Sequence, residues 1–396
     1  MFSTEPRVPR AALTMTRTTA VSDQIYRRLQ RSLNRQAVGF PAVLSGADIR
    51  VLKRLFEPAE ARLALHLSCK AASTEEVARR AAAEFSAEQT RALLEGMLRK
   101  GAIGWKERGG VSHWYVLPLV VGMYECQDGN PSAELLADVD AYMETIGFEM
   151  SFLAVRPSQM RTIPIHQSIP VDHAVATYDQ ILALVESSPG PFAVLPCICR
   201  RSKMMGGNPC KKTSRDETCL AFADGARIVL QRTRCREVTR DEVRAILQQN
   251  EADGLVLQPA NTQKPDFVCS CCGCCCGMLR FQQRMPYPLD FWSTNYFAEI
   301  SGETCSRCGT CVSRCQVGAI AISGPFGEAR VEPGRCIGCG LCVPTCPGDA
   351  VHLKERALAA IPPKDDEALC DEILANKKGT LAKLWMALKV ILKQKQ

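Results

Sequence analysis

Residues 305–315 read CSRCGTCVSRC, and residues 336–347 read CIGCGLCVPTCP. Both stretches place their cysteines at the spacing C-x2-C-x2-C-x3-C, so the second is an internal repeat of the first. Three thiolates at this spacing can wrap one corner of an iron–sulfur cube, while the fourth faces the other way and ligates a second cluster. The repeat therefore predicts a compact fold built around two [4Fe–4S] clusters.

The exchange of the fourth cysteines gives each predicted cluster its own ligand set. Zinc is the alternative, because cysteine pairs at x2 spacing also bind zinc tetrahedrally. Zinc sites use two such pairs rather than two matched runs of four, so iron–sulfur is favoured. One cluster is expected on Cys305, Cys308, Cys311 and Cys346, and the other on Cys336, Cys339, Cys342 and Cys315.

This segment resembles the bacterial two-cluster ferredoxins. The resemblance implies an electron-transfer fold that makes no bonds itself. One departure is visible, because Gln316 stands where the pattern has proline, as at Pro347. We expect Gln316 to add a backbone donor and a polar side chain near its cluster without abolishing the site.

A second concentration of cysteine lies upstream, where residues 269–278 read CSCCGCCCGM and residues 197–219 read CICRRSKMMGGNPCKKTSRDETC. The cationic side chains of the second stretch favour thiolates over thiols. We expect the two stretches to bind at least one further iron–sulfur cluster together. The candidate ligands are Cys197, Cys199, Cys210, Cys219, Cys269, Cys271, Cys272, Cys274, Cys275 and Cys276.

The spacing inside residues 269–276 gives two interleaved x2 registers, one of Cys269, Cys272 and Cys275 and one of Cys271 and Cys274. Adjacent side chains diverge, so neighbouring cysteines are not expected to share one metal. The CCG element resembles those of heterodisulfide reductase subunits, which implies a non-cubane cluster as one option. A zinc site and a metal-free dithiol pair are the alternatives.

Composition indicates a reducing compartment. The chain has 22 cysteines among 396 residues, its N-terminal residues carry no apolar run of signal-peptide length, and no stretch is long enough for a membrane-spanning helix. We therefore expect a cytoplasmic protein whose clustered cysteines serve metal or redox chemistry. The net charge of +7 lies in the two tails, which weakens an argument for nucleic-acid binding from bulk charge.

The predicted fold class is α+β and multidomain. Helical spacing from residue 46, a capping box at Ser86 and Gln89, and alternation around Gly109 and Gly110 predict three helices and a hairpin, as in a winged helix. In the middle of the chain, residues 162–169, 191–197, 226–230 and 254–259 are expected as strands. Thr239 with Glu242 predicts a second capping box, which opens a helix. The predicted parts are a tail and basic helix (1–45), a winged-helix-like domain (46–125), an α+β Cys-rich cluster domain (126–298), a two-cluster ferredoxin domain (299–356), and a linker with a basic amphipathic helix (357–396).

A winged helix beside iron–sulfur clusters suggests a redox-sensing DNA-binding regulator. The expected recognition helix, residues 86–100, carries Arg91, Arg99 and Lys100 against Glu88 and Glu95, which is nearly balanced. DNA-reading helices usually present a basic face. We therefore favour protein docking or a structural role for this domain.

The closing segment KKGTLAKLWMALKVILKQKQ, residues 377–396, has its apolar residues on one stripe and most of its lysines off that stripe. This pattern fits a helix lying on the inner face of an anionic membrane, and it fits equally a helix docked on a partner protein or on the protein itself. Peripheral membrane contact is therefore one expectation for a cytoplasmic chain.

Over most of its length the chain resembles a group of bacterial 4Fe–4S ferredoxin-type proteins, through GFPAVLSGADIRVLKRLF, PLVVGMYE, CICR and CSCCGCCCGM before the repeat. The resemblance implies cluster binding. No nucleotide-binding or nucleophile motif is visible, so no catalytic residue is assigned. We expect a redox relay or oxidoreductase subunit that exchanges electrons with redox partner proteins, with substrate chemistry at the central cluster as an alternative.

Overall fold

The computed structural model describes residues 10–127, 131–168, 176–231, 235–285, 287–323, 327–377 and 379. Most of the predicted C-terminal amphipathic helix lies outside these residues. The chain divides into two compact units. Unit 1 contains residues 1–119 and 134–149, and unit 2 contains residues 120–133 and 150–396. Within the described part of the chain, no helix has the length and apolarity needed to cross a membrane.

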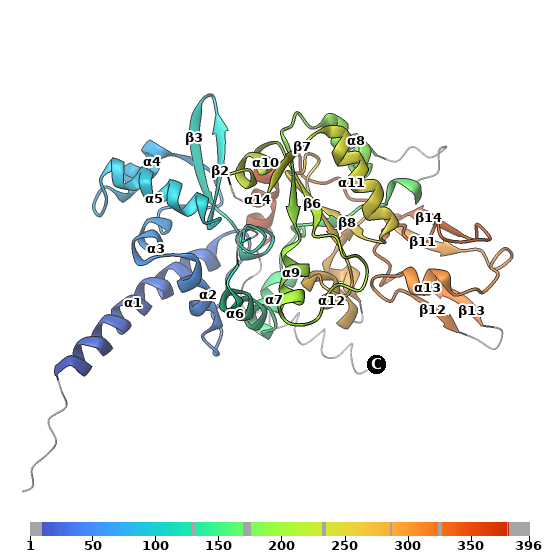
Figure 1. Ribbon diagram of the computed structural model, residues 1–396, viewed down its shortest axis with the longest axis horizontal. Helices are drawn as coiled ribbons and strands as arrows, with labels where there is room; N and C mark the ends of the chain where they lie inside the picture. The colour runs from blue at the N-terminus through green and yellow to red at the C-terminus, as the bar shows by residue number, and fades with distance from the viewer. Residues whose placement is uncertain are drawn as a thin grey trace, which may run out of the picture. The chain divides into compact units, whose positions relative to one another are not determined.

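Unit 1 is a group of helices with a small antiparallel sheet, ordered β1-β3-β2 (Figure 1). Strands β2 and β3 form the predicted hairpin, in which Ile103 pairs with Val116 and Arg108 with Val111. Its elements are α1 (Arg10–Arg35), α2 (Ala47–Leu55), α3 (Pro58–Ala64), β1 (Ala72–Ser73), α4 (Thr74–Ala81), α5 (Ala87–Arg99), β2 (Ile103–Arg108), β3 (Val111–Val116), α6 (Ala133–Met143) and α7 (Ile146–Leu153).

Local signals account for much of unit 1. The capping box at α5 is confirmed, because the Ser86 hydroxyl accepts from the Gln89 N–H and the Gln89 side chain accepts from the Ser86 N–H. Helix α1 lies within the segment predicted as a tail and basic helix (1–45). The returning segment 134–149 packs through Tyr142, whose ring lies 4.8 Å from that of Phe40 and whose hydroxyl donates to the Pro41 carbonyl.

Unit 2 is built on a five-stranded antiparallel sheet in the order β7-β5-β6-β9-β8. Apolar side chains from β5, β6 and α10, such as Ala193, Ala221 and Ala226, form a buried cluster. The elements of this part are β4 (Arg161–Thr162), α8 (Ile181–Ser187), β5 (Phe192–Pro196), α9 (Ile198–Met205), β6 (Glu217–Phe222), α10 (Ala223–Val229), β7 (Arg236–Val238), α11 (Arg240–Ala252), β8 (Val256–Pro259), β9 (Phe267–Cys271) and α12 (Gly277–Arg284).

Two predicted strands of unit 2 are wrong. Among the described residues of 162–169, only Thr162 belongs to a strand, and His166–Ser168 form a 3-10 helix. Residues 226–230 belong largely to helix α10, whereas the predicted strands at 191–197 and 254–259 are confirmed as β5 and β8. A short apolar run does not by itself distinguish a strand from a buried helix. Here Ala226, Ile228 and Val229 are buried at helical spacing.

The C-terminal part of unit 2 contains two small antiparallel sheets, one of β11 with β14 and one of β12 with β13 (Figure 1). The cysteine repeat falls in the loops and the short helix between these strands. The elements are β10 (Ser293–Thr294), β11 (Tyr296–Ile300), α13 (Thr310–Arg314), β12 (Ile320–Ser323), β13 (Glu328–Val331), β14 (Val351–Glu355) and α14 (Asp366–Ala375).

Candidate metal–sulfur centres

Seven of the eight cysteines of the repeat fall into two sets, within which the thiols influence one another's pKa. Cys315, at the end of α13, acts electrostatically on Cys336, Cys339 and Cys342, although it precedes them in the chain. Cys311 is likewise coupled to Cys305 and Cys308. Cys315 of the first run therefore lies with the second run, and the ligand sets of the two clusters stay a prediction.

The sulfur atoms of the repeat accept backbone hydrogen bonds, as cluster-ligating thiolates do. The N–H groups of Ala298, Ala319 and Ala350 lie 3.2, 3.1 and 3.2 Å from the sulfurs of Cys336, Cys315 and Cys346. Within the described residues, no three of the eight sulfurs lie within 4.8 Å of one another. The donor set and the wide spacing fit a multi-iron cluster better than a single ion.

Burial sets the protonation of these thiols. Burial, together with the neighbouring Cys315 and Cys336, raises the pKa of Cys339 to about 12 against a backbone hydrogen bond from Leu341. Burial likewise raises the pKa of Cys342. Because metal ligands must be deprotonated, cluster binding has to release these protons.

The loop around the second run is fixed by a close backbone contact. Gly338 has φ +63°, and a Cβ at this position would lie 2.3 Å from the Tyr296 carbonyl oxygen. Only glycine meets both conditions without strain. The loop that carries Cys336 and Cys339 is thereby held against β11.

The central cysteines come together at one end of the five-stranded sheet. Cys219 lies on β6, and Cys269 and Cys271 lie on β9. Alternate strand residues face the same side, so Cys269 and Cys271 share a face while Ser270 faces away, where its hydroxyl accepts from Asn250 of α11. The other candidates lie at the start of α9 (Cys197, Cys199), in the following loop (Cys210), in the turn after β9 (Cys272, Cys274, Cys275) and before α12 (Cys276).

Four of these cysteines, Cys210, Cys272, Cys274 and Cys275, form what we call the four-thiol group. Their sulfur atoms all lie within 4.8 Å of one another. The separations are 3.6 Å for Cys210–Cys272, 3.8 Å for Cys210–Cys274, 3.5 Å for Cys272–Cys274 and 3.7 Å for Cys274–Cys275.

The other six candidates, which we call the six-thiol group, are neighbours in which each thiol shifts the pKa of two others, in an order that closes into a ring. Its order around the ring is Cys197, Cys199, Cys276, Cys271, Cys269, Cys219 and back to Cys197. Among the described residues no three of these sulfurs lie within 4.8 Å of one another, so the ring is wider than the four-thiol group. The hydrogen bonds from Cys197 and Cys269 hold the pKa of Cys219 well below its usual range.

This division corrects the two predictions made from spacing. The expected register of Cys269, Cys272 and Cys275 is split between the groups. Adjacent Cys274 and Cys275 lie in the same group, because the chain turns tightly there, with the N–H groups of Cys275 and Cys276 both directed at the Cys272 carbonyl. The cysteines are therefore grouped by the end of strand β9 at Cys271 and the turn that follows it, not by a uniform x2 spacing.

A buried cation lies between the two groups. Arg200 is 5% exposed and acts electrostatically on Cys197 and Cys219 of the six-thiol group and on Cys272 of the four-thiol group. One guanidinium nitrogen donates to the Ser270 carbonyl at 2.8 Å. Its Nε is buried without an acceptor among the described residues. A negatively charged metal–thiolate centre would satisfy both the charge and this donor.

Two further residues at this site were not predicted as parts of it. The Glu125 carboxylate accepts a hydrogen bond from the Gly122 N–H at 2.7 Å. Burial raises the pKa of Glu125 to about 7. Its charge in turn raises the pKa of Cys269. Gln316 reaches from the repeat into the cysteine-rich turn, where its Oε1 accepts from the Gly273 N–H at 2.9 Å. In the sequence, the one signal of this contact is that position 316 has glutamine where the ferredoxin pattern has proline.

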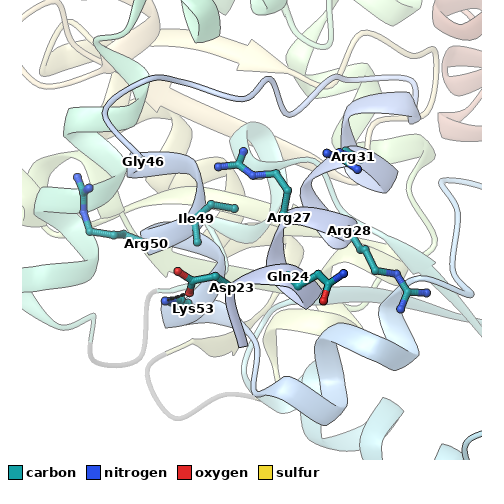
Figure 2. Close-up of a pocket in the computed structure, with 9 residues that line it drawn as sticks. All are labelled: Asp23, Gln24, Arg27, Arg28, Arg31, Gly46, Ile49, Arg50 and Lys53. Atoms are coloured by element: carbon teal, nitrogen blue, oxygen red, sulfur yellow. Dashed lines mark ion pairs between the residues drawn. The ribbon is translucent and has the colours of Figure 1, made fainter. Parts of the chain in front are cut away.

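Unit 1 contains a separate basic pocket between α1 and α2 (Figure 2). Three of its five cations already pair with carboxylates, because Arg27 contacts Asp48 at 2.6 Å, Arg50 contacts Asp138 at 2.6 Å and Lys53 pairs with Asp23. These pairs reduce the charge available to an anion. The pocket is lined by Asp23, Gln24, Arg27, Arg28, Arg31, Gly46, Ile49, Arg50 and Lys53.

The cysteine repeat and the ten central cysteines together indicate an iron–sulfur protein of ferredoxin type. In agreement, residues 304–356 match the 4Fe-4S dicluster domain. No curated protein and no solved structure matches the chain. The match covers the repeat, and the central cysteines lie outside it.

Proposed function

We propose that this protein transfers electrons between redox partner proteins, as a relay or as a subunit of an oxidoreductase. Two [4Fe–4S] clusters would be held by the repeat, with Cys315 and Cys346 exchanged between the runs. A further iron–sulfur cluster would be held by the six-thiol group. When bound, these clusters supply one-electron oxidation and reduction.

The contact between Gln316 and Gly273 is the observation that carries this proposal. Gln316 follows Cys315, a ligand proposed for the second cluster, and Gly273 follows Cys272 in the central site. The hydrogen bond at 2.9 Å therefore joins the backbones of the two sites by a short path. Gln316 also donates to the Gly254 carbonyl at 3.0 Å, which fixes its amide in place.

The chain prepares the central site for a negatively charged centre. Arg200 supplies a buried positive charge beside both groups. The sheet and α11 hold β6 and β9 together, because the Asn250 side chain donates to both the Thr218 carbonyl and the Ser270 hydroxyl. Thiols held at fixed positions lose less entropy when they bind a cluster.

Electron paramagnetic resonance of the reduced, anaerobically purified chain tests the proposal. We expect the coupled signal of two neighbouring cubes and an additional signal. The Cys271→Ser variant should lose the additional signal and keep the coupled one, whereas Cys308→Ser should disturb the coupled signal alone. A wild-type spectrum with only the coupled signal would contradict the proposed third cluster.

As a second candidate we propose a redox-sensing DNA-binding regulator with a winged-helix-like unit 1. The supporting observation is the basic pocket, where Arg28 and Arg31 are exposed on α1 (Figure 2). The ion pairs of the other three cations make this function the less favoured one. Salt-dependent binding to DNA, weakened by Arg28→Gln with Arg31→Gln, tests it, and no binding at low salt would exclude it.

A further inference from the structure

The sulfur separations in the four-thiol group have a specific chemical meaning. A single zinc or iron ion bound by four thiolates has metal–sulfur distances of about 2.3 Å, so a regular tetrahedron places its sulfurs about 3.8 Å apart. Four of the six sulfur–sulfur separations lie between 3.5 and 3.8 Å, and all six lie within 4.8 Å. A [4Fe–4S] cluster binds its four thiolates through four different irons, so its ligand sulfurs lie farther apart than those on a single ion.

We propose that Cys210, Cys272, Cys274 and Cys275 bind one divalent metal ion, zinc or iron, in a tetrahedral site separate from the iron–sulfur clusters. Tetrahedral coordination by four sulfurs is typical of zinc and of iron. This inference rests on sulfur geometry and does not require the electron transfer proposed above.

The surroundings of the group suit such an ion. Cys272 and Cys275 are buried against Leu255, with Cys210, Cys274 and Cys199 packed around them. The Lys212 N–H lies 3.4 Å from the Cys210 sulfur and offers it a hydrogen bond. Arg200 is close enough to act on the charges of Cys210 and Cys272. A tetrathiolate site carries a net negative charge, which these groups offset.

The ion would link two segments that are far apart in the sequence. Cys210 is 62 residues from Cys272, and three of the four ligands lie within one tight turn. A metal held in this way fixes the loop after α9 to the turn after β9. The six-thiol group lies beside it, because Cys199 packs on the four-thiol group while forming part of the ring.

Metal analysis and spectroscopy of the full-length chain, purified anaerobically, test the proposal. In the zinc arm, X-ray absorption at the zinc edge should show four sulfur neighbours at about 2.3 Å and no metal neighbour. In the iron arm, the Mössbauer spectrum should contain one mononuclear tetrathiolate iron beside the cluster iron. Either result supports a single-ion site.

The variant Cys210→Ser should lose about one zinc or one mononuclear iron per chain and keep all cluster signals. Its matched control, Cys199→Ser, should lose the additional cluster signal and keep the single ion. Loss of several irons with Cys210→Ser would overturn the proposal, as would unchanged metal content. If Cys210→Ser does not fold, the spectra of the wild-type protein test the site. Spectra that contain neither tetrathiolate zinc nor mononuclear tetrathiolate iron would contradict it.

Discussion

The Gln316 side chain accepts a hydrogen bond from the backbone N–H of Gly273 at 2.9 Å, and the Gln283 side chain donates to the backbone oxygens of both residues, at 2.7 Å for Gln316 and 3.2 Å for Gly273. The residue after a cysteine of the repeat is thus held against the middle of the CSCCGCCC stretch. Two cysteine-rich segments 43 residues apart share one hydrogen-bonded contact. We expect this contact to contribute to both stability and electron transfer.

Gln316→Ala should leave the buried Gly273 N–H without its acceptor. Such a loss costs about 1–3 kcal/mol, and we expect slower electron exchange between the repeat and the central site. Chemical denaturation and the kinetics of flash reduction measure the two effects. Gln263→Ala is a matched control, because it removes a comparable hydrogen bond to the Pro362 carbonyl. Equal electron-exchange rates in the two variants would contradict a role for the bridge.

Gly273→Ala should disrupt the central site, because the added Cβ would lie 2.3 Å from the Gln316 carbonyl oxygen and 2.5 Å from the Gln283 Nε2 atom. Overpacking of this kind costs about 1–3 kcal/mol. We expect loss of central metal and retention of about eight cluster irons in the repeat. Gly302→Ala, which has open space around its Cβ, should keep the wild-type metal content. Full central metal in Gly273→Ala would show that the close contact is not required.

Cys315→Ser should remove the cluster expected on Cys336, Cys339 and Cys342, because Cys315 faces that set. Its counterpart Cys346→Ser should remove the other cluster. Electron paramagnetic resonance and iron content distinguish the two, since each variant should keep one uncoupled cube. If Cys315→Ser instead removed the cluster of its own run, the exchange of ligands between the runs would be wrong.

The sequence predicts some features of this structure and not others. The capping boxes at Ser86 and Thr239 are confirmed because each depends on residues three positions apart. The pairing of Cys210 with Cys272 depends on how β6, β9 and the loop after α9 come together, which no local spacing records. For the same reason the sequence predicts that the ten central cysteines bind at least one further cluster, but not which of them lie together.

Arg200→Met should destabilise the central site, because the variant removes the buried charge and leaves the Ser270 carbonyl without its donor. The loss of stability should be about 1–3 kcal/mol, and the reduction potential of the central site should fall, since a positive charge favours the reduced form. Redox titration measures the potential. A change in the reduction potentials of the repeat clusters alone would contradict an effect of Arg200 on the central site.

Glu251 should make stability depend on pH. Burial raises its pKa above the usual value of a glutamate, against hydrogen bonds from the backbone at His166 and Gln167. The folded state therefore holds this proton at pH values where the unfolded chain has lost it, so stability should fall as pH rises from about 4.3 through the raised folded-state pKa and then level off. Glu251→Gln should flatten this part of the curve, as thermal unfolding between pH 5 and 8 will show. An unchanged slope would contradict the assignment.

The count of iron, acid-labile sulfide and zinc per chain, on anaerobically purified protein, decides whether the central cysteines bind metal. The two clusters of the repeat account for about eight irons and about eight sulfides. We predict more iron and sulfide than this, with the excess sulfide and its iron lost in Cys271→Ser. About eight irons, no zinc and no effect of Cys271→Ser would mean that the repeat alone binds metal, and the proposed central metal–sulfur centres would be wrong.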